Sequence, residues 1–145
     1  METMDGAGRL RAAGMRVTST RLAILEVVRT GRHPAADDVA RAVRERVGYV
    51  TLQAVYEALG AFTEAGLLRK IDIGTGPARY EARVGDNHHH LVCRRCGAVG
   101  DVDCAVGHAP CLEPSESLRL GYVIDEAEVT FWGLCADCQQ APAPS

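Results

Sequence analysis

Apolar residues in the first half of the chain recur at the spacing of amphipathic helices. A short helix is expected from about residue 8 to residue 13, ending at Gly14. Thr18 can cap a second helix, because its hydroxyl can accept a hydrogen bond from a backbone N–H of the first turn, and Gly31 can end it. The apolar residues of this second helix are Leu22, Ile24, Leu25 and Val28.

A third helix is expected from about residue 34 to residue 47. Asp37 and Asp38 fall in its first turn, where the helix dipole favours negative charge. Valines recur every four residues along it and predict one buried stripe, which consists of Val39, Val43 and Val47.

A fourth helix is expected from Thr51, a capping residue, to Ala65, with Gly66 ending it. Two short strands then flank residues 74–77, Gly-Thr-Gly-Pro, which is typical of a hairpin turn. Helices followed by a hairpin are the order of a winged helix, although a generic small helical domain with a ribbon has the same order. The predicted buried face of the fourth helix consists of Leu52, Val55, Leu59 and Phe62.

The pattern changes after residues 84–87, Val-Gly-Asp-Asn, which we expect to form a hinge. Beyond them the chain alternates short apolar runs with turn residues, which predicts a small sheet. We therefore predict an α+β protein with a winged helix at 1–83 and a small α/β domain at 88–145. The expected elements of the second domain are strands at 89–93, 99–103 and 128–132 and a short helix at 115–120.

The charge differs between the two halves of the chain. Residues 1–83 have a net charge of +3, whereas residues 84–145 have −6 and contain all six cysteines and four of the five histidines. This asymmetry suggests two domains with different roles. The overall pI of 5.9 argues weakly against nucleic-acid binding, but a local patch decides such binding. No signal-peptide pattern or membrane-spanning apolar run is visible, so we expect a soluble, cytosolic protein that has no membrane partner.

Two CxxC pairs give the strongest motif. The pairs are separated by 38 residues, and each places two sulfurs on one tight turn. Four thiolates satisfy zinc and leave no open position, so a structural zinc is predicted. A pair of disulfides or a redox CxxC is the alternative, which a reducing cytosol disfavours. The predicted ligands are Cys93, Cys96, Cys135 and Cys138.

Three consecutive histidines precede the first CxxC pair. In a strand, His88 and His90 point to one face and His89 to the other. Two imidazoles on one face near carboxylates suit Fe(II), Mn(II), Zn(II) or Ni(II), although a histidine triplet can also be a solvated turn. His33 precedes Pro34 in the loop between the second and third helices, and by itself it would be a surface histidine.

The chain resembles the ferric uptake regulator (Fur) family along nearly its whole length. The matching stretches are MRVTSTR, HPAADDV, TLQAVYEAL, AGLLRK, ARYEAR, DNHHHLVCRRCG and the final CADC. The resemblance implies a metal-dependent transcriptional repressor that is not an enzyme. It also implies a homodimer, a winged-helix DNA-binding domain, a dimerisation domain with a structural zinc, and a regulatory Fe(II) or Mn(II) at the domain junction.

Carried over by position, the resemblance implies five ligands for the regulatory metal. An ion ligated from both sides of the hinge would convert metal concentration into a conformational equilibrium, because only the closed state offers every ligand. The ligands are His33 and Glu81 from the first domain and His88, His90 and Asp101 from the second.

The stretches VGDNHHHLVCR, DVDCAVGHAPCL and IDEAEVTFWGLC most resemble the FurA/CatR branch, peroxide-responsive repressors of catalase-peroxidase genes. Peroxide sensors of the PerR type resemble this chain at Asp101 but have Asp where this chain has Glu81. A glutamate at that position is more similar to the iron sensors. Some family members use a further metal site with a histidine where this chain has Ala127, so that site is predicted to be absent.

The resemblance places helix 51–65 in the major groove of A·T-rich palindromic operator DNA. Gln53 can pair with an adenine edge, and Tyr56 can pack on a thymine methyl or reach a phosphate. Arg16 matches a basic position that the family inserts into the minor groove. The full predicted DNA-contacting set is Arg16, Arg21, Thr51, Gln53, Tyr56 and Arg69, each of which could instead be a solvated surface residue.

Three alternatives remain open. The same scaffold could regulate iron, zinc or nickel uptake, the CxxC pairs could belong to a thiol oxidoreductase, or a zinc scaffold could bind protein. Cys104 and Cys111 are either packed small residues or a secondary thiol switch, with packing favoured, and His108 between them is expected to be a loop residue.

Overall fold

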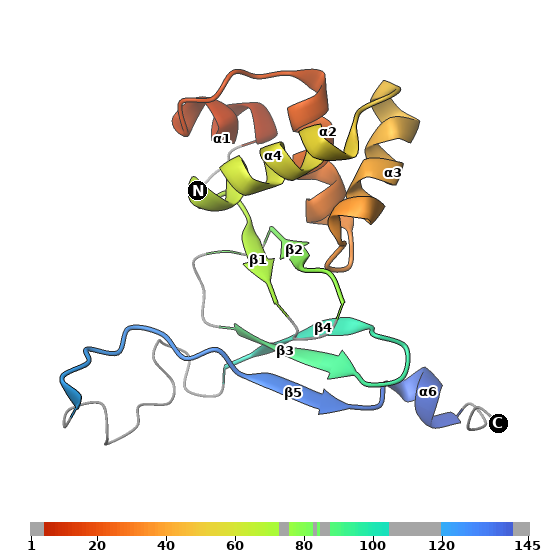
Figure 1. Cartoon of the computed structure of the whole chain (residues 1–145), viewed down its shortest axis with the longest axis vertical. Helices are drawn as coiled ribbons and strands as arrows, with labels where there is room; N and C mark the ends of the chain where they lie inside the picture. The colour runs from red at the N-terminus through yellow and green to blue at the C-terminus, as the bar shows by residue number, and fades with distance from the viewer. Residues whose placement is uncertain (1–4, 73–75, 83, 85–87, 105–119, 141–145) are drawn as a thin grey trace. The chain divides into compact units, whose positions relative to one another are not determined.

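The computed structural model describes residues 5–72, 76–82, 84, 88–104 and 120–140 (Figure 1). The chain divides into two compact units, which we call unit 1 (Met1–Val84) and unit 2 (Gly85–Ser145). Within the described ranges, no helix is both long enough and apolar enough to cross a membrane.

The described residues of unit 1 form four helices, of which α2 and α4 begin at the predicted caps Thr18 and Thr51; the cap of α1, Asp5, was not predicted, and α3 has no side-chain cap. The side chains of Asp5, Thr18 and Thr51 each accept a hydrogen bond from a backbone N–H three residues later. Gly66, at a φ of +77°, follows α4 and allows the chain to reverse into the next strand. The helices are α1 (Gly6–Ala12), α2 (Ser19–Thr30), α3 (Ala36–Val47) and α4 (Leu52–Glu64).

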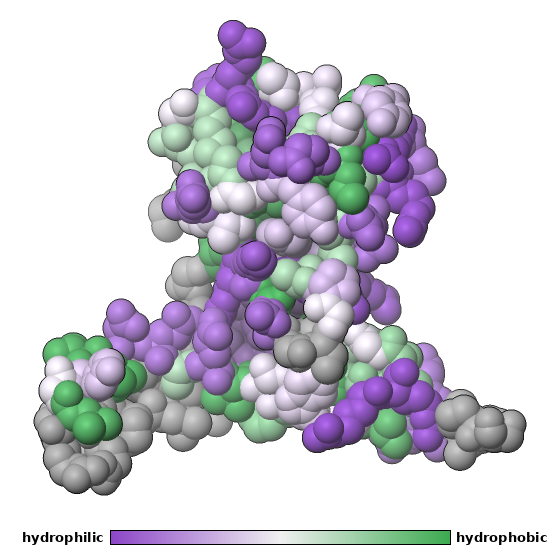
Figure 2. Space-filling model, viewed as in Figure 1, coloured by the Kyte–Doolittle hydropathy of each residue, from purple (hydrophilic) through white to green (hydrophobic). Residues whose placement is uncertain are grey.

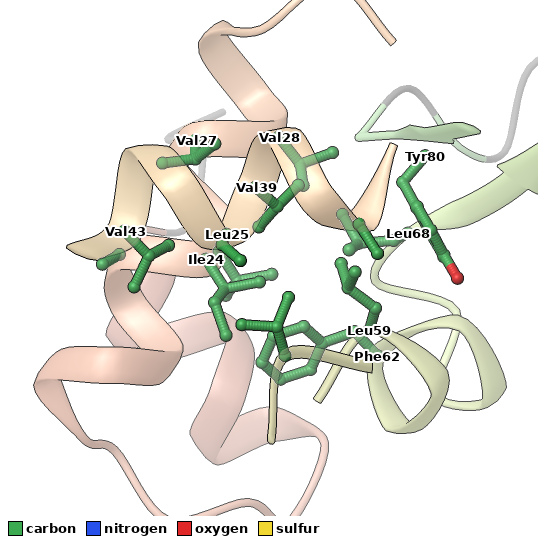
Figure 3. Close-up of a cluster of buried hydrophobic side chains, with 14 of the residues drawn as sticks. Ile24, Leu25, Val27, Val28, Val39, Val43, Leu59, Phe62, Leu68 and Tyr80 are labelled. Atoms are coloured by element: carbon green, nitrogen blue, oxygen red, sulfur yellow. The ribbon is translucent and has the colours of Figure 1, made fainter. Parts of the chain in front are cut away.

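The apolar faces of these helices meet in one core (Figure 3). Phe62 and Leu59 from α4 pack against Ile24 from α2 and Val39 from α3, and all four are fully buried. Their burial is the main term that stabilises unit 1. On the surface of unit 1, hydrophilic side chains are interspersed with small apolar patches (Figure 2).

Two predicted core positions are wrong. Val47 is 38% exposed and Leu52 is 36% exposed, because they lie at the facing ends of α3 and α4, beyond the last residues that reach the core. Val50, in the turn between these helices, is buried in their place.

The predicted hairpin is present. Strand β1 (Arg69–Ile71) pairs antiparallel with β2 (Arg79–Glu81), with Arg69 opposite Glu81. The far end of the expected turn, residues 73–75, lies outside the described residues. Helices followed by this hairpin form the predicted winged helix, and with the sheet of unit 2 they confirm the α+β class.

Unit 2 is built on a three-stranded sheet of order β4-β3-β5. The central strand β3 (His88–Cys93) runs antiparallel to β4 (Val99–Asp103) and parallel to β5 (Thr130–Gly133). A short helix, α6 (Ala136–Gln140), follows β5 and was not predicted. Residues 85–87 of the expected hinge and residues 115–119 of the expected helix lie outside the described residues.

Candidate metal centres and DNA-binding face

Four cysteine thiols of unit 2 form a cluster. Their Sγ atoms all lie within 4.8 Å of one another. Four sulfurs at this separation suit a tetrahedral divalent ion, since zinc–sulfur bonds are about 2.3 Å long. The cluster joins the two predicted CxxC pairs, Cys93, Cys96, Cys135 and Cys138.

The local fold explains why these cysteines meet. Cys93 ends β3, and its N–H donates to the carbonyl of Ala98 at 2.9 Å, which closes the turn that contains Cys96. Parallel pairing of β3 with β5 places Cys93 beside Gly133, two residues before the second pair begins. Arg95 donates from Nη1 to the carbonyl of Cys138 at 2.7 Å and ties this turn to α6.

The pKa values of the clustered thiols indicate that a bound cation would stabilise their ionised forms. Backbone N–H groups of Cys135 and Cys96 lower the pKa of the Cys93 thiol to about 5. Hydrogen bonding with the Cys135 thiol raises the pKa of Cys138 to about 12. Crowded thiols therefore do not all ionise by themselves, whereas a divalent cation compensates several thiolate charges at once. The donor set fits a structural zinc with no open position.

A histidine and a carboxylate meet in unit 1. Nε2 of His33 lies 3.3 Å from Oε2 of Glu81. The loop that carries the histidine is paired with β2, because the N–H of Tyr80 donates to the carbonyl of Pro34 at 2.9 Å. Arg79 donates from Nη1 to the carbonyl of His33 at 3.2 Å. These main-chain contacts bring two predicted ligands together.

The backbone of His33 is in the left-handed region, with a φ of +55°. This conformation is unfavourable for a residue with a side chain, so neighbouring contacts must maintain it. The contacts from β2 described above supply that support. Such supported strain is typical of residues whose side-chain direction matters for function.

Two histidines and a carboxylate meet in unit 2. Nε2 of His88 lies 3.7 Å, and Nε2 of His90 lies 3.6 Å, from the same oxygen of Asp101. The β3–β4 register explains this, since His90 is directly opposite Asp101 and His88 is two residues away on the same face. The two imidazole rings are 5.0 Å apart, centroid to centroid.

The five predicted regulatory ligands thus form two local groups, which we call the unit 1 pair (His33, Glu81) and the unit 2 triad (His88, His90, Asp101). Nitrogen and oxygen donors of this kind suit Fe(II) or Mn(II), and both groups fit such an ion by their chemistry.

The predicted DNA-contacting residues lie on unit 1. Gln53 and Tyr56 are exposed on α4, and Nε2 of Gln53 donates to Glu57 at 3.2 Å. Arg21 donates from Nη1 to the carbonyl of Arg16 at 2.7 Å, which steadies the loop before α2. One groove is lined by residues 15–21, which lead into α2, and by residues 54–62 of α4, and Arg16 and Arg21 both contribute to it.

The other two members of that set have structural contacts. The hydroxyl of Thr51 caps α4, so its side chain also serves the fold. Nε of Arg69 lies 4.0 Å from Oε1 of Glu81, across the β1–β2 pair. One unit 1 ligand is therefore next to a predicted phosphate contact.

The family model described as "Ferric uptake regulator family" matches residues 12–108. The chain belongs to the ferric uptake regulator family. It is 54% identical over 134 residues to the transcriptional regulator FurA of Mycobacterium tuberculosis, a match that covers 92% of this chain and 90% of that one.

Solved structures of ferric uptake regulators have the same fold. The Vibrio cholerae protein superposes with a TM-score of 0.72 at 26% identity, covering 90% of this chain and 100% of that one. The Pseudomonas aeruginosa regulator, solved with manganese, gives 0.65 at 27% identity, covering 92% and 99%.

Sequence reasoning missed the residues that hold the candidate ligands of this Fur-family chain in place. Arg79 and Pro34 position His33 through main-chain contacts, and Arg95 does so for the thiol cluster. An arginine that binds a carbonyl has no pattern of its own in a sequence. Cys104 is half-buried at the end of β4, while Cys111 and His108 lie outside the described residues.

Proposed function

We propose that this chain is a metal-dependent transcriptional repressor that binds A·T-rich palindromic operators as a homodimer. The observation that carries the proposal is the pairing of two kinds of ligand group with a winged helix. A closed thiol cluster lies in unit 2, and nitrogen and oxygen ligands are divided between the unit 1 pair and the unit 2 triad.

The two kinds of ligand group have different roles. Four thiolates leave no open coordination position for a substrate, so zinc in the thiol cluster has a structural role and stabilises unit 2. Fe(II) or Mn(II) is the regulatory ion, and we propose that one ion takes ligands from both the pair and the triad. Binding then selects the conformation in which all five ligands are available, which is how metal concentration sets DNA affinity.

DNA is read by α4, with Gln53 and Tyr56 facing the bases. The minor groove or the phosphates are contacted by Arg16, Arg21 and Arg69. Thr51 lies at the start of α4, near the DNA backbone. Residues 1–83 have the net positive charge that such binding needs. A homodimer presents two copies of this face to a palindrome.

We further propose that the repressor responds to peroxide and controls catalase-type oxidative-stress genes. The 54% identity to a FurA protein supports the assignment to that branch. Asp101 agrees with peroxide sensors, whereas Glu81 agrees with iron sensors. Control of iron, zinc or nickel uptake on the same scaffold is the second candidate.

A mobility-shift experiment tests the proposal. The parent protein should shift an A·T-rich palindromic duplex in the presence of Mn(II) and lose most of this affinity when the ion is removed. His33→Ala should keep its zinc and its melting temperature but lose the Mn(II) dependence. Equal binding by parent and variant at every Mn(II) concentration would contradict the proposed mechanism.

A second assay addresses the enzyme alternative. Reduction of a disulfide substrate by the chain, measured with a thiol reductant as the electron source, should not exceed the background rate. Turnover that disappears in Cys135→Ser would instead favour a thiol oxidoreductase.

A further inference from the structure

Tyr49 is a prominently exposed aromatic residue of unit 1. Its exposed fraction is 84%, and it lies in the turn between α3 and α4, two residues before the cap of α4. Val47, Leu52 and Tyr56 are also exposed around this turn, which makes a small apolar and aromatic patch at the start of the proposed recognition helix.

The exposed Tyr49 ring contacts an arginine. Cζ of Arg44 lies 5.6 Å from the ring centroid, within the range of a cation–π contact. Arg44 is itself anchored, because its Nε donates to the carbonyl of the buried residue Val50 at 2.9 Å. Gly48, at a φ of +89°, sets the chain direction that brings the two side chains together.

The surroundings of this pair are positive. Residues 44–56 contain two arginines, Arg44 and Arg46, and one acidic residue, Glu45, and α4 has no acidic residue in its first turn. The partial positive charge of the α4 N-terminus adds to the charges of Arg44 and Arg46. The turn therefore has a net positive charge, which complements a polyanion.

We infer that Tyr49 and Arg44 bind the phosphodiester backbone of the operator, at a phosphate flanking the groove that α4 enters. The inference rests on the proposed function. The Tyr49 hydroxyl donates to a phosphate oxygen, and the Arg44 guanidinium holds the ring in the orientation that this requires. A ring that is already held by this contact loses less conformational entropy on binding, and a phosphate contact positions the helix without reading sequence.

Affinity measurements on two duplexes test this inference. The Mn(II)-loaded full chain is titrated against a duplex that the parent selects from a random-sequence library and against a scrambled duplex of equal composition. Tyr49→Phe and Tyr49→Ala should each weaken binding to both duplexes by about tenfold, since a hydrogen bond to a charged acceptor is lost. The ratio between the two affinities should not change.

Two further variants sharpen the result. Arg44→Gln should reduce the slope of log affinity against log salt concentration by about one phosphate contact per chain. Tyr122→Phe, which alters an exposed tyrosine of unit 2, is the matched control and should leave DNA affinity unchanged. Melting temperatures should agree among parent and Tyr49 variants, because this side chain is not part of the core.

The outcomes separate this inference from the proposed function. If the parent selects no duplex, the proposed function itself fails. If the parent binds and Tyr49→Phe binds equally well, only the phosphate contact is overturned. A changed ratio between the duplexes would show base reading instead, and a lower oligomer mass for Tyr49→Ala in sedimentation would show a protein interface. Either result overturns the inference.

Discussion

The thiol cluster and the nitrogen–oxygen ligands of this chain differ in how the sequence assembles them. All four cysteines belong to unit 2, where β3, its following turn and α6 bring them together. The other proposed ligands are divided, with a pair in unit 1 and a triad in unit 2, each held by local strand pairing.

This difference separates a structural role from a regulatory one. An ion in a group that one unit assembles contributes its binding free energy to the folding of that unit. An ion that needs ligands from two units contributes its binding free energy to the equilibrium between their arrangements. Under the proposed function, the same chain retains one metal permanently and responds to the concentration of another.

The largest expected effect is the loss of unit 2 in Cys96→Ser. Apparent zinc-binding free energies for structural sites are on the order of 10 kcal/mol, so a three-thiol site should release zinc and leave unit 2 unfolded. Zinc content and amide hydrogen exchange measure this. Cys104→Ser, a half-buried cysteine outside the cluster, is the control and should keep both zinc and protection.

A core truncation in unit 1 should destabilise unit 1 and leave the zinc content of unit 2 unchanged. Phe62→Ala removes a fully buried ring and should destabilise unit 1 by about 3–5 kcal/mol. Zinc content should not change, because the thiol cluster belongs to unit 2. Val47→Ala, at an exposed position, should cost less than about 0.5 kcal/mol. Loss of zinc from Phe62→Ala would break the distinction between the units.

Peroxide should distinguish the regulatory ligands from the thiols. Fe(II) can reduce peroxide, whereas Mn(II) does so far less readily. Fe(II)-loaded protein should therefore lose DNA binding on exposure to peroxide, while Mn(II)-loaded protein should not. Peptide mass spectrometry should find one added oxygen on His33, His88 or His90. Metal-independent inactivation that a reductant reverses would instead indicate oxidation of the cysteines.

The smallest expected effect concerns a positioning residue. Arg79→Gln removes the guanidinium that donates to the carbonyl of His33 and should raise the Mn(II) concentration needed for half-maximal DNA binding by about threefold to tenfold. DNA affinity at saturating Mn(II) should stay close to that of the parent. A uniform loss at all Mn(II) concentrations would mean that Arg79 contacts DNA directly.

Residue patterns predicted the elements because local chemistry determines them. Thr18 and Thr51 begin helices by capping them, and alternation in the histidine-rich segment gave the strand that β3 forms. Val47 and Leu52 were misplaced because periodicity does not reveal where a core ends. Helix α6 was missed because five residues give too short a pattern for periodicity.

The candidate ligands also show that sequence patterns reveal local contacts but not distant ones. The CxxC spacing by itself predicted the thiol cluster, since both members of each pair are local in sequence. The spacing of His33 and Glu81 did not predict that these two side chains meet, because 47 residues separate them and only the pairing of β2 with the loop at Pro34 brings them together. Resemblance to the family supplied what the local pattern lacked.

A double-mutant cycle between the two ligand groups tests the central claim most directly. Glu81→Gln alters the unit 1 pair, Asp101→Asn alters the unit 2 triad, and Mn(II)-dependent DNA affinity is measured for parent, both single variants and the double variant. If one ion uses both groups, each single variant loses the Mn(II) response and the double variant loses little more. Independent, additive losses would show two separate sites and contradict the claim.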